Sequence, residues 1–189
     1  MRPIQGFSLV ELMVAVGIMA ILLALGLPEF NTYLSNTRLR TAAEVFVSSM
    51  QSAKAAAAAR NQAVELILTN ATDPASLTTA VATNPAAGWM IRTTDQTVYI
   101  EGKNPSEGGR GGVSVVSVTG TVSGVTFTAL GGTTLAATAT FAFTNPTGGA
   151  CVSDTPAGPM RCLNIIVSST GRVKLCDPAT VAPDTRSCT

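Results

Sequence analysis

The feature that most constrains this chain is an apolar stretch from Phe7 to Leu27. Its 21 residues include one ionisable side chain, Glu11. As an α-helix the stretch would be about 32 Å long, which is enough to cross the hydrocarbon layer of a bilayer. A carboxylate in such a segment costs roughly 2.5–3.5 kcal/mol at the membrane centre, and less near an end. Glu11 therefore calls for a partner of opposite charge.

A short leader, Met1-Arg2-Pro3-Ile4-Gln5-Gly6, precedes the apolar stretch. Cleavage after Gly6 would give Phe7 a free ammonium group. That group could pair with Glu11 of a neighbouring copy, or with Glu11 of the same chain one helical turn away. Two simpler interpretations are a secretory signal peptide, cut near residues 24–26, and a plain membrane anchor. The apolar run is longer than the roughly 7–15 residues usual in a signal peptide, and neither interpretation accounts for Glu11.

These residues together resemble the N-terminus of type IV prepilins and related pseudopilins. The matching features are the basic leader ending in Gly6, then Phe7, then Glu11 as the fifth mature residue, and the long apolar helix with Pro28. The resemblance implies that a membrane prepilin peptidase cuts between Gly6 and Phe7 and methylates the new N-terminus. It further implies assembly from the inner membrane into a helical filament, with Glu11 setting the axial register.

The helical pattern continues beyond Pro28 on one apolar face. Residues on that face step by three and four, as in an amphipathic helix: Leu39, Ala43, Phe46, Met50, Ala53 and Ala57. We expect one helix from about Phe7 to Arg60, capped near Asn61, with the second half lying against a sheet. Pro28 lacks a backbone donor, so a kink is expected there, close to Gly26.

The remainder predicts short strands joined by turn-rich segments. The candidate strands are residues 63–69, 88–93, 98–101, 113–118, 125–128, 138–144, 162–168 and 172–176. Segments 70–85 and 102–112 are predicted to be loops. The glycine-rich run 108–112 lacks the spacing of a phosphate-binding loop. The fold class is therefore α+β, and the resemblance implies the pilin fold: a leader at 1–6, a helix at 7–61 with 7–27 as membrane or filament core, and a β-rich domain at 62–189.

The four cysteines all lie in the last quarter of the chain: Cys151, Cys162, Cys176 and Cys188. Their spacings of 11, 14 and 12 contain no C-x-x-C pair, and the chain has no histidine to complete a zinc site. Two disulfides in an oxidising compartment are the better account. Of three connectivities we expect sequential pairing, with each closed loop contributing on the order of 3 kcal/mol.

Composition argues against an enzyme. Charged residues make up 12% of the chain, with 12 basic against 11 acidic, so net charge alone indicates neither nucleic acid nor an anionic membrane as a partner. Without histidine there is no Ser-His or Cys-His pair. Asp154, Asp177 and Asp184 are assigned to turns and charge balance. No catalytic residue, metal or cofactor is expected.

The C-terminal segment predicts a hairpin that turns at Thr170-Gly171, with Arg172 and Lys174 on one face. Together with the last residues it resembles the GspH/FimT class of minor pilins, which includes FimT and FimU. FimT-type proteins bind DNA through a Gly-Arg-x-Arg motif, and here Gly171-Arg172-Val173-Lys174 has lysine in the last place. Arg186 would lie nearby if Cys188 pairs with Cys176. The alternative is a solvated face whose charges Asp177 and Asp184 balance.

The resemblance thus implies a minor pilin of a type IV pilus, anchored in the inner membrane by residues 7–27 with a periplasmic domain, and later part of an extracellular filament. The implied partners are the prepilin peptidase, other minor and major pilins and the assembly platform. Two other functions stay open: a DNA-binding pilin for DNA uptake in transformation, and a GspH-type pseudopilin of a type II secretion system.

Overall fold

Helix α1 (Leu9–Arg60) is the first element of the computed structural model, which describes residues 8–86, 88–103, 114–117 and 122–188. The chain divides into two compact units, residues 1–34 and 35–189. The helix contributes to both, because its residues up to Leu34 belong to the first unit and the rest to the second. The long helix that the sequence predicts is confirmed, and its end at Arg60 is as expected.

The C-terminus of α1 is closed by a Schellman motif. Asn61 has a φ of 51°, in the left-handed region that asparagine tolerates better than most residues. The Gln62 N–H donates to the Ala57 carbonyl (3.2 Å), and the Asn61 N–H donates to the Ala58 carbonyl (3.3 Å). Asn61 is therefore the cap that the sequence indicated.

The strands form two four-stranded sheets, and within each sheet neighbouring strands are antiparallel. Within the described residues the strands are β1 (Val64–Leu68), β2 (Trp89–Thr93), β3 (Tyr99–Lys103), β4 (Ser114–Ser117), β5 (Gly124–Phe127), β6 (Ala139–Thr144), β7 (Leu163–Val167) and β8 (Val173–Cys176). The first sheet has the order β3-β2-β1-β5 and the second the order β4-β6-β7-β8. Each predicted strand overlaps one of these, although residues 104–113 and 118–121 lie outside the described part of the chain.

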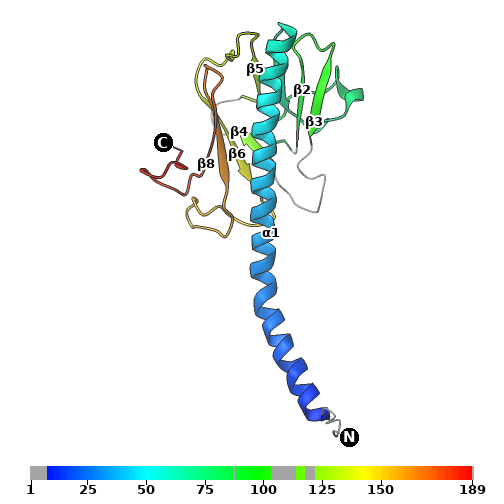
Figure 1. The fold of residues 1–189 in the computed structure, drawn as a ribbon, viewed down its shortest axis with the longest axis vertical. Coiled ribbons are helices and arrows are strands. Elements are labelled where there is room, and N and C mark those ends of the chain that lie inside the picture. Colours follow the sequence, from blue (N-terminus) through cyan, green and yellow to red (C-terminus); the bar gives the residue numbers. More distant parts are fainter. Residues whose placement is uncertain (1–7, 87, 104–113, 118–121, 189) are drawn as a thin grey trace, which may run out of the picture. The chain divides into compact units, whose positions relative to one another are not determined.

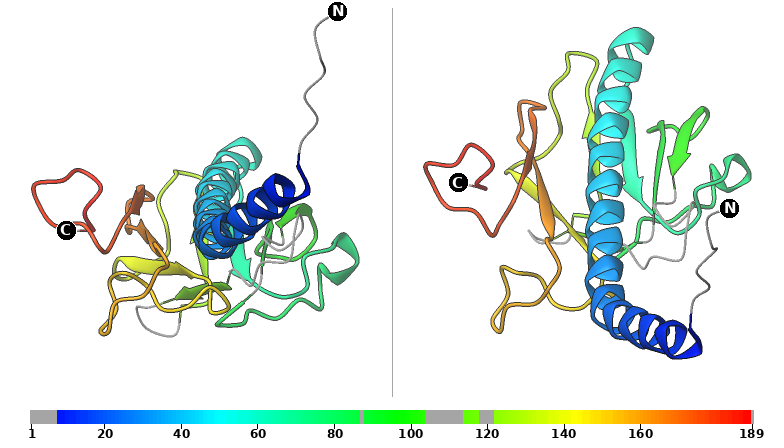
Figure 2. Two further views of the ribbon diagram at one scale, coloured as in Figure 1. Left: turned by 90° about the horizontal axis from the view of Figure 1, so that it is seen from below. Right: turned by 60° about the horizontal axis from the view of Figure 1, so that its bottom comes forward.

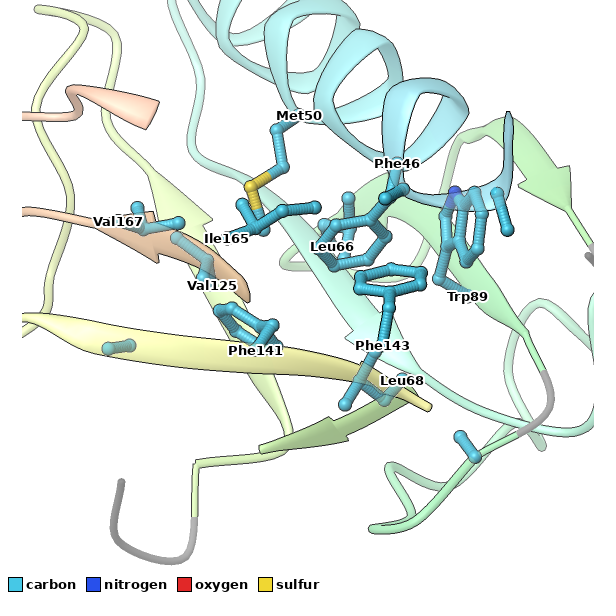
Figure 3. Packing of buried hydrophobic residues seen from close by; sticks show 14 of the residues in the cluster. Phe46, Met50, Leu66, Leu68, Trp89, Val125, Phe141, Phe143, Ile165 and Val167 are labelled. Carbon is cyan, nitrogen blue, oxygen red and sulfur yellow. The ribbon is translucent and has the colours of Figure 1, made fainter. Parts of the chain in front are cut away.

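Phe46 of α1 joins the two sheets through one aromatic cluster. Its ring lies 4.9 Å from that of Trp89 in the first sheet, and 5.5 Å and 5.2 Å from those of Phe141 and Phe143 in the second. Figure 3 shows Phe46 pointing from the helix into this group. All six helix positions predicted for the apolar face are fully buried, so the amphipathic half of α1 supplies the centre of the core.

The second unit is a layer of helix on two sheets. In Figure 1 the strands β2 and β3 lie to one side of α1, while β6 and β8 lie to the other. The views in Figure 2 show the same placement of the two groups of strands about this half of the helix. The sequence predicted an antiparallel sheet under the helix but did not reveal its division into two, because strand periodicity carries no information on which strands pair.

The outer face of the first sheet is covered by the segment between β1 and β2. All five residues of β2 are buried, and Met90 packs with Ile67 and Ala80 in a small separate cluster. The predicted loop 70–85 contains one 3₁₀ turn, η1 (Pro74–Ser76), whose first turn is capped by the Asp73 side chain. This segment thus gives β2 a second buried face, which explains why Trp89, Met90 and Ile91 are apolar in succession rather than alternating. The buried Arg92 of the same strand forms an ion pair with Glu65 at 2.7 Å.

Both predicted disulfides are present with the expected connectivity. Cys151 pairs with Cys162, and Cys176 pairs with Cys188. Two short, separate loops at the C-terminal end of the chain are therefore closed covalently.

We expect Phe46→Ala to lower the free energy of unfolding by about 3–5 kcal/mol, because the change leaves a cavity between both sheets and the helix. The measurement is urea unfolding of the full-length protein in detergent micelles, followed by the fluorescence of Trp89, its single tryptophan. Leu130→Ala is the control, since that side chain is 99% exposed and its loss should change stability by less than about 0.5 kcal/mol. Equal midpoints for the two variants would contradict the central place given to Phe46.

Candidate functional site

The N-terminus of α1 begins with a side-chain cap. Ser8 Oγ accepts a hydrogen bond from the Glu11 N–H (3.2 Å), and the Leu12 N–H donates to the Ser8 carbonyl (3.2 Å). Ser8 and Glu11 have the three-residue spacing of a capping box. The capping role of Ser8 was not predicted from the sequence, although its spacing from Glu11 could have revealed it. The predicted processing residues Gly6 and Phe7 lie outside the described residues.

Glu11 is exposed and lies in the first turn of α1. The partial positive charge at a helix N-terminus favours a carboxylate at this position. Glu11 is also the only charged side chain between Leu9 and Leu27. The first turn therefore presents one acidic side chain at the edge of an apolar surface, where it could pair with a cation.

The apolar surface of the first unit is extensive. Thirteen large apolar side chains between positions 9 and 27 are 54–74% exposed. They are Leu9, Val10, Leu12, Met13, Val14, Val16, Ile18, Met19, Ile21, Leu22, Leu23, Leu25 and Leu27. Among the described residues α1 is the one helix long and apolar enough to cross a membrane, and none of its apolar window is buried. Such a surface needs lipid or other helices to cover it.

Pro28 lies inside α1, whose helical assignment runs from Leu9 to Arg60 without interruption. The residue before it and the residue after it are both helical. The kink expected at this position, close to Gly26, stays a prediction.

The β7–β8 hairpin turns where the sequence indicated. Gly171 has a φ of +77°, and a Cβ there would lie 2.2 Å from the Gly131 carbonyl oxygen. The Gly171 N–H donates to the Ser168 carbonyl (2.9 Å), and Lys54 Nζ of α1 donates to the Gly171 carbonyl (3.2 Å). The tip of the hairpin is thus held against a neighbouring loop and against the helix.

The three cations predicted to form a basic site have different surroundings. Arg172 is exposed, and no hydrogen bond or ion pair engages its side chain within the described residues. Lys174 Nζ donates to the Ser187 carbonyl (2.8 Å). Arg186 forms two hydrogen bonds to the carboxylate of Asp184, at 2.7 and 3.2 Å, so its charge is locally balanced.

The structure places the last residues of the chain beside β8, as the Cys176–Cys188 pairing predicted. The Asp177 N–H donates to the Arg186 carbonyl (2.7 Å). Arg161 forms an ion pair with the buried Asp177 at 2.6 Å, and the sequence reading did not find this pair. Of the three predicted cations, Arg186 is thus balanced by Asp184, whereas Asp177 pairs with Arg161, which is not one of the three.

The described residues offer no obvious metal site. All four cysteines are in disulfides, and no group of three acidic, histidine or cysteine side chains lies together in the part of the chain that the structure describes. The arrangement instead presents an apolar helix with one carboxylate, and a separate folded unit with a constrained hairpin.

Comparison with known families gives two matches. The prokaryotic N-terminal methylation motif matches residues 1–27, and the family described as type II transport protein GspH matches residues 42–178. Among curated proteins, the chain is 46% identical over 43 residues to prepilin peptidase-dependent protein D of Escherichia coli K12. That alignment covers 23% of this chain and 30% of the relative, so the chain spans less than a third of the relative's length.

Among solved structures, the fold is similar to two crystal forms of the type IV minor pilin FimU from Pseudomonas aeruginosa PAO1. The first has a TM-score of 0.51 at 19% identity and covers 79% of this chain and 99% of FimU. The second has a TM-score of 0.54 at 18% identity and covers 83% and 99%. The pilin-like fold predicted from the sequence is thereby confirmed.

The hydrogen bond from the Arg186 guanidinium is the main reason that the pKa of Asp184 falls from 3.8 to about 2. Because the folded-state pKa is the lower one, the stabilisation from this pair is complete above about pH 4 and is lost as the pH falls towards 2. We expect a ¹³C NMR titration of the Asp184 carboxyl to show it still ionised at pH 3. Arg186→Ala should raise its midpoint, and a midpoint near 4 in the unsubstituted protein would contradict the pairing.

Proposed function

This chain belongs to the GspH family, and from that membership, its N-terminal methylation motif and the exposed apolar half of α1 we propose that it is a minor pilin of a type IV pilus. The observation that carries the proposal is the segment from Leu9 to Leu27 of α1, an apolar helix surface with Glu11 as its only charge. Such a surface suits first a bilayer and then a bundle of like helices.

The proposed maturation removes residues 1–6 by cleavage between Gly6 and Phe7 and methylates Phe7. The mature chain is then a single-pass inner-membrane protein, held by residues 7–27, with its globular domain in the periplasm. Assembly moves the apolar helix from lipid into the filament core, where the Phe7 ammonium pairs with Glu11. The partners are the prepilin peptidase, the assembly platform and other minor and major pilins.

A pseudopilin of a type II secretion system is the second candidate. The matching family, type II transport protein GspH, favours it. A pilus and a secretion pseudopilus would use the same anchor and the same fold, so phenotype must separate them. A clean deletion scored in one strain for piliation, for protein secretion and for DNA uptake separates the pilus, the secretion system and a role in DNA uptake. Loss of secretion with normal pili would replace the pilus assignment.

A DNA-contacting role of the β7–β8 hairpin is the third candidate, supported by the exposed Arg172 at a constrained turn, whose side chain has no ion pair among the described residues. Lys174, two residues further, donates to a backbone carbonyl and keeps its charge, whereas Arg186 is engaged by the Asp184 carboxylate. We therefore place any such contact on Arg172 and Lys174 and leave Arg186 out.

We expect Glu11→Ala to be cleaved normally but to enter filaments at least a hundredfold less, because removing one partner of a buried ion pair costs about 3–5 kcal/mol. Mass spectrometry of the mature N-terminus measures cleavage, and immunoblotting of sheared filaments measures incorporation. Glu29→Ala is the matched control, since Glu29 is an exposed acid of α1 beyond the apolar stretch. Equal incorporation of both variants would remove Glu11 from the assembly mechanism.

For DNA, we expect the full-length protein in micelles to bind duplex DNA without sequence preference. The slope of log K against log salt should be about −1.8 if two phosphates are neutralised. Arg172→Ala with Lys174→Ala should abolish that slope, while Arg186→Ala should leave it unchanged because Arg186 is already paired. Binding that depends on Arg186, or that survives the double substitution, would exclude the hairpin site.

A further inference from the structure

Asn36 of α1 makes two hydrogen bonds to the loop that the Cys151–Cys162 disulfide closes. Its Nδ2 donates to the Pro159 carbonyl (3.3 Å), and its Oδ1 accepts from the Arg161 N–H (2.7 Å). The partners are separated from Asn36 by 123 and 125 residues. One side chain of the helix therefore reaches the C-terminal region of the chain.

The contact uses both ends of the amide. The Pro159 carbonyl needs a donor and the Arg161 N–H needs an acceptor, and an asparagine side chain supplies one of each. Met160, the residue between the two partners, is fully buried in the main core. The amide thus pairs with the backbone on both sides of an anchored residue, much as a neighbouring strand would.

The loop that Asn36 contacts is held by several further interactions. Besides the disulfide, the Val152 N–H donates to the Met160 carbonyl (2.7 Å) and the Gly158 N–H donates to the Cys151 carbonyl (2.9 Å). The Arg161 side chain continues outward to the buried Asp177 at 2.6 Å. Because Asp177 follows Cys176, this ion pair links the first disulfide loop to the second. Asn36 is consequently fastened to a covalently closed and cross-braced segment.

Asn36 lies at the start of the part of α1 that belongs to the second unit. The second unit begins at Ser35, and the first fully buried residue of α1 among those described is Leu39. Asn36 lies about one turn ahead of Leu39, before the first fully buried side chain of the helix. Its two hydrogen bonds therefore hold a turn that precedes the buried face.

We propose that Asn36 is a latch that fastens α1 to the Cys151–Cys162 loop and so sets the point at which the helix is released from the globular unit. With the latch closed, the held part of the helix begins at residue 35. With it open, the held part begins one turn later, at the first buried side chain. The proposal concerns the folded chain by itself and holds for a pilin and a pseudopilin alike.

The test is hydrogen–deuterium exchange of the full-length protein in detergent micelles, followed by mass spectrometry of peptides covering residues 35–41. Asn36→Ala should speed exchange there by about tenfold or more, since two hydrogen bonds are lost. Alanine has a higher helix propensity than asparagine, so intrinsic propensity would predict slower exchange. The direction of the change therefore separates the tertiary contact from local helix stability.

Three further variants sharpen the result. Asn36→Asp keeps the acceptor for Arg161 but loses the donor for Pro159, and should give an intermediate rate. Cys151→Ser with Cys162→Ser should reproduce Asn36→Ala in the same peptides. Asn31→Ala, the same substitution at an exposed asparagine of α1, should leave exchange in residues 35–41 unchanged.

The proposal stands if exchange rises in residues 35–41 while peptides covering β1 and β2 keep their protection. It is overturned if Asn36→Ala leaves these rates unchanged, if Asn31→Ala speeds them equally, or if Asn36→Ala speeds exchange throughout β1 and β2. Should the double cysteine variant fail to fold, the two Asn36 variants still decide the question.

Discussion

The burial of one face of α1 between two sheets is the interaction on which the globular unit depends. Phe46 meets aromatic side chains of both sheets, and the buried face continues to Ala57 near the end of the helix. Neither sheet has a complete core without the helix, because each turns apolar side chains toward it. The helix is therefore as much a part of the fold as any strand, and not an appendage of the domain.

The other half of α1 exposes a large apolar surface that the described part of the chain does not cover. Burying a large apolar side chain is worth roughly 1.5–3 kcal/mol, so its thirteen exposed apolar residues represent some 20–40 kcal/mol. A bilayer or a bundle of similar helices can supply this burial, and transfer between them exchanges one apolar environment for another. Apolar burial then favours both places and selects neither. In the assembly proposed above Glu11 makes that selection, since a carboxylate in an apolar environment is stabilised by a nearby cation.

The sequence was informative where a structural feature leaves a local or periodic pattern. The buried face of α1, the cap at Asn61 and the turn at Gly171 were predicted because they depend on helical spacing or on residues that tolerate positive φ. The disulfide connectivity was predicted because the spacings allow two compact loops. The capping residue Ser8 belongs to the same class: its spacing from Glu11 was readable and was overlooked.

Other features could not be read because they join distant positions without a repeating pattern. The division into two sheets follows from which strands pair, and alternation of side chains is the same for any partner. The Arg161–Asp177 pair and the contacts of Asn36 depend on how the C-terminal loops fold back on the helix. For the basic site, the sequence identified the cations but not their surroundings, and the Asp184 carboxylate decides how much charge Arg186 offers.

Three polar side chains spaced along α1 help to fix the axial position of the helix on the sheets. Apart from Phe46, much of the buried face of α1 is alanine, and such small side chains distinguish only weakly between positions one turn apart. Asn36 contacts the first disulfide loop, Ser49 donates to Glu101 of β3 (3.2 Å), and Lys54 donates to the hairpin tip (3.2 Å). A shift of the helix by one turn, about 5.4 Å, would break the hydrogen bonds of all three side chains at once. Apolar burial thus holds the helix on the sheets, and these directional contacts determine its register together with Phe46.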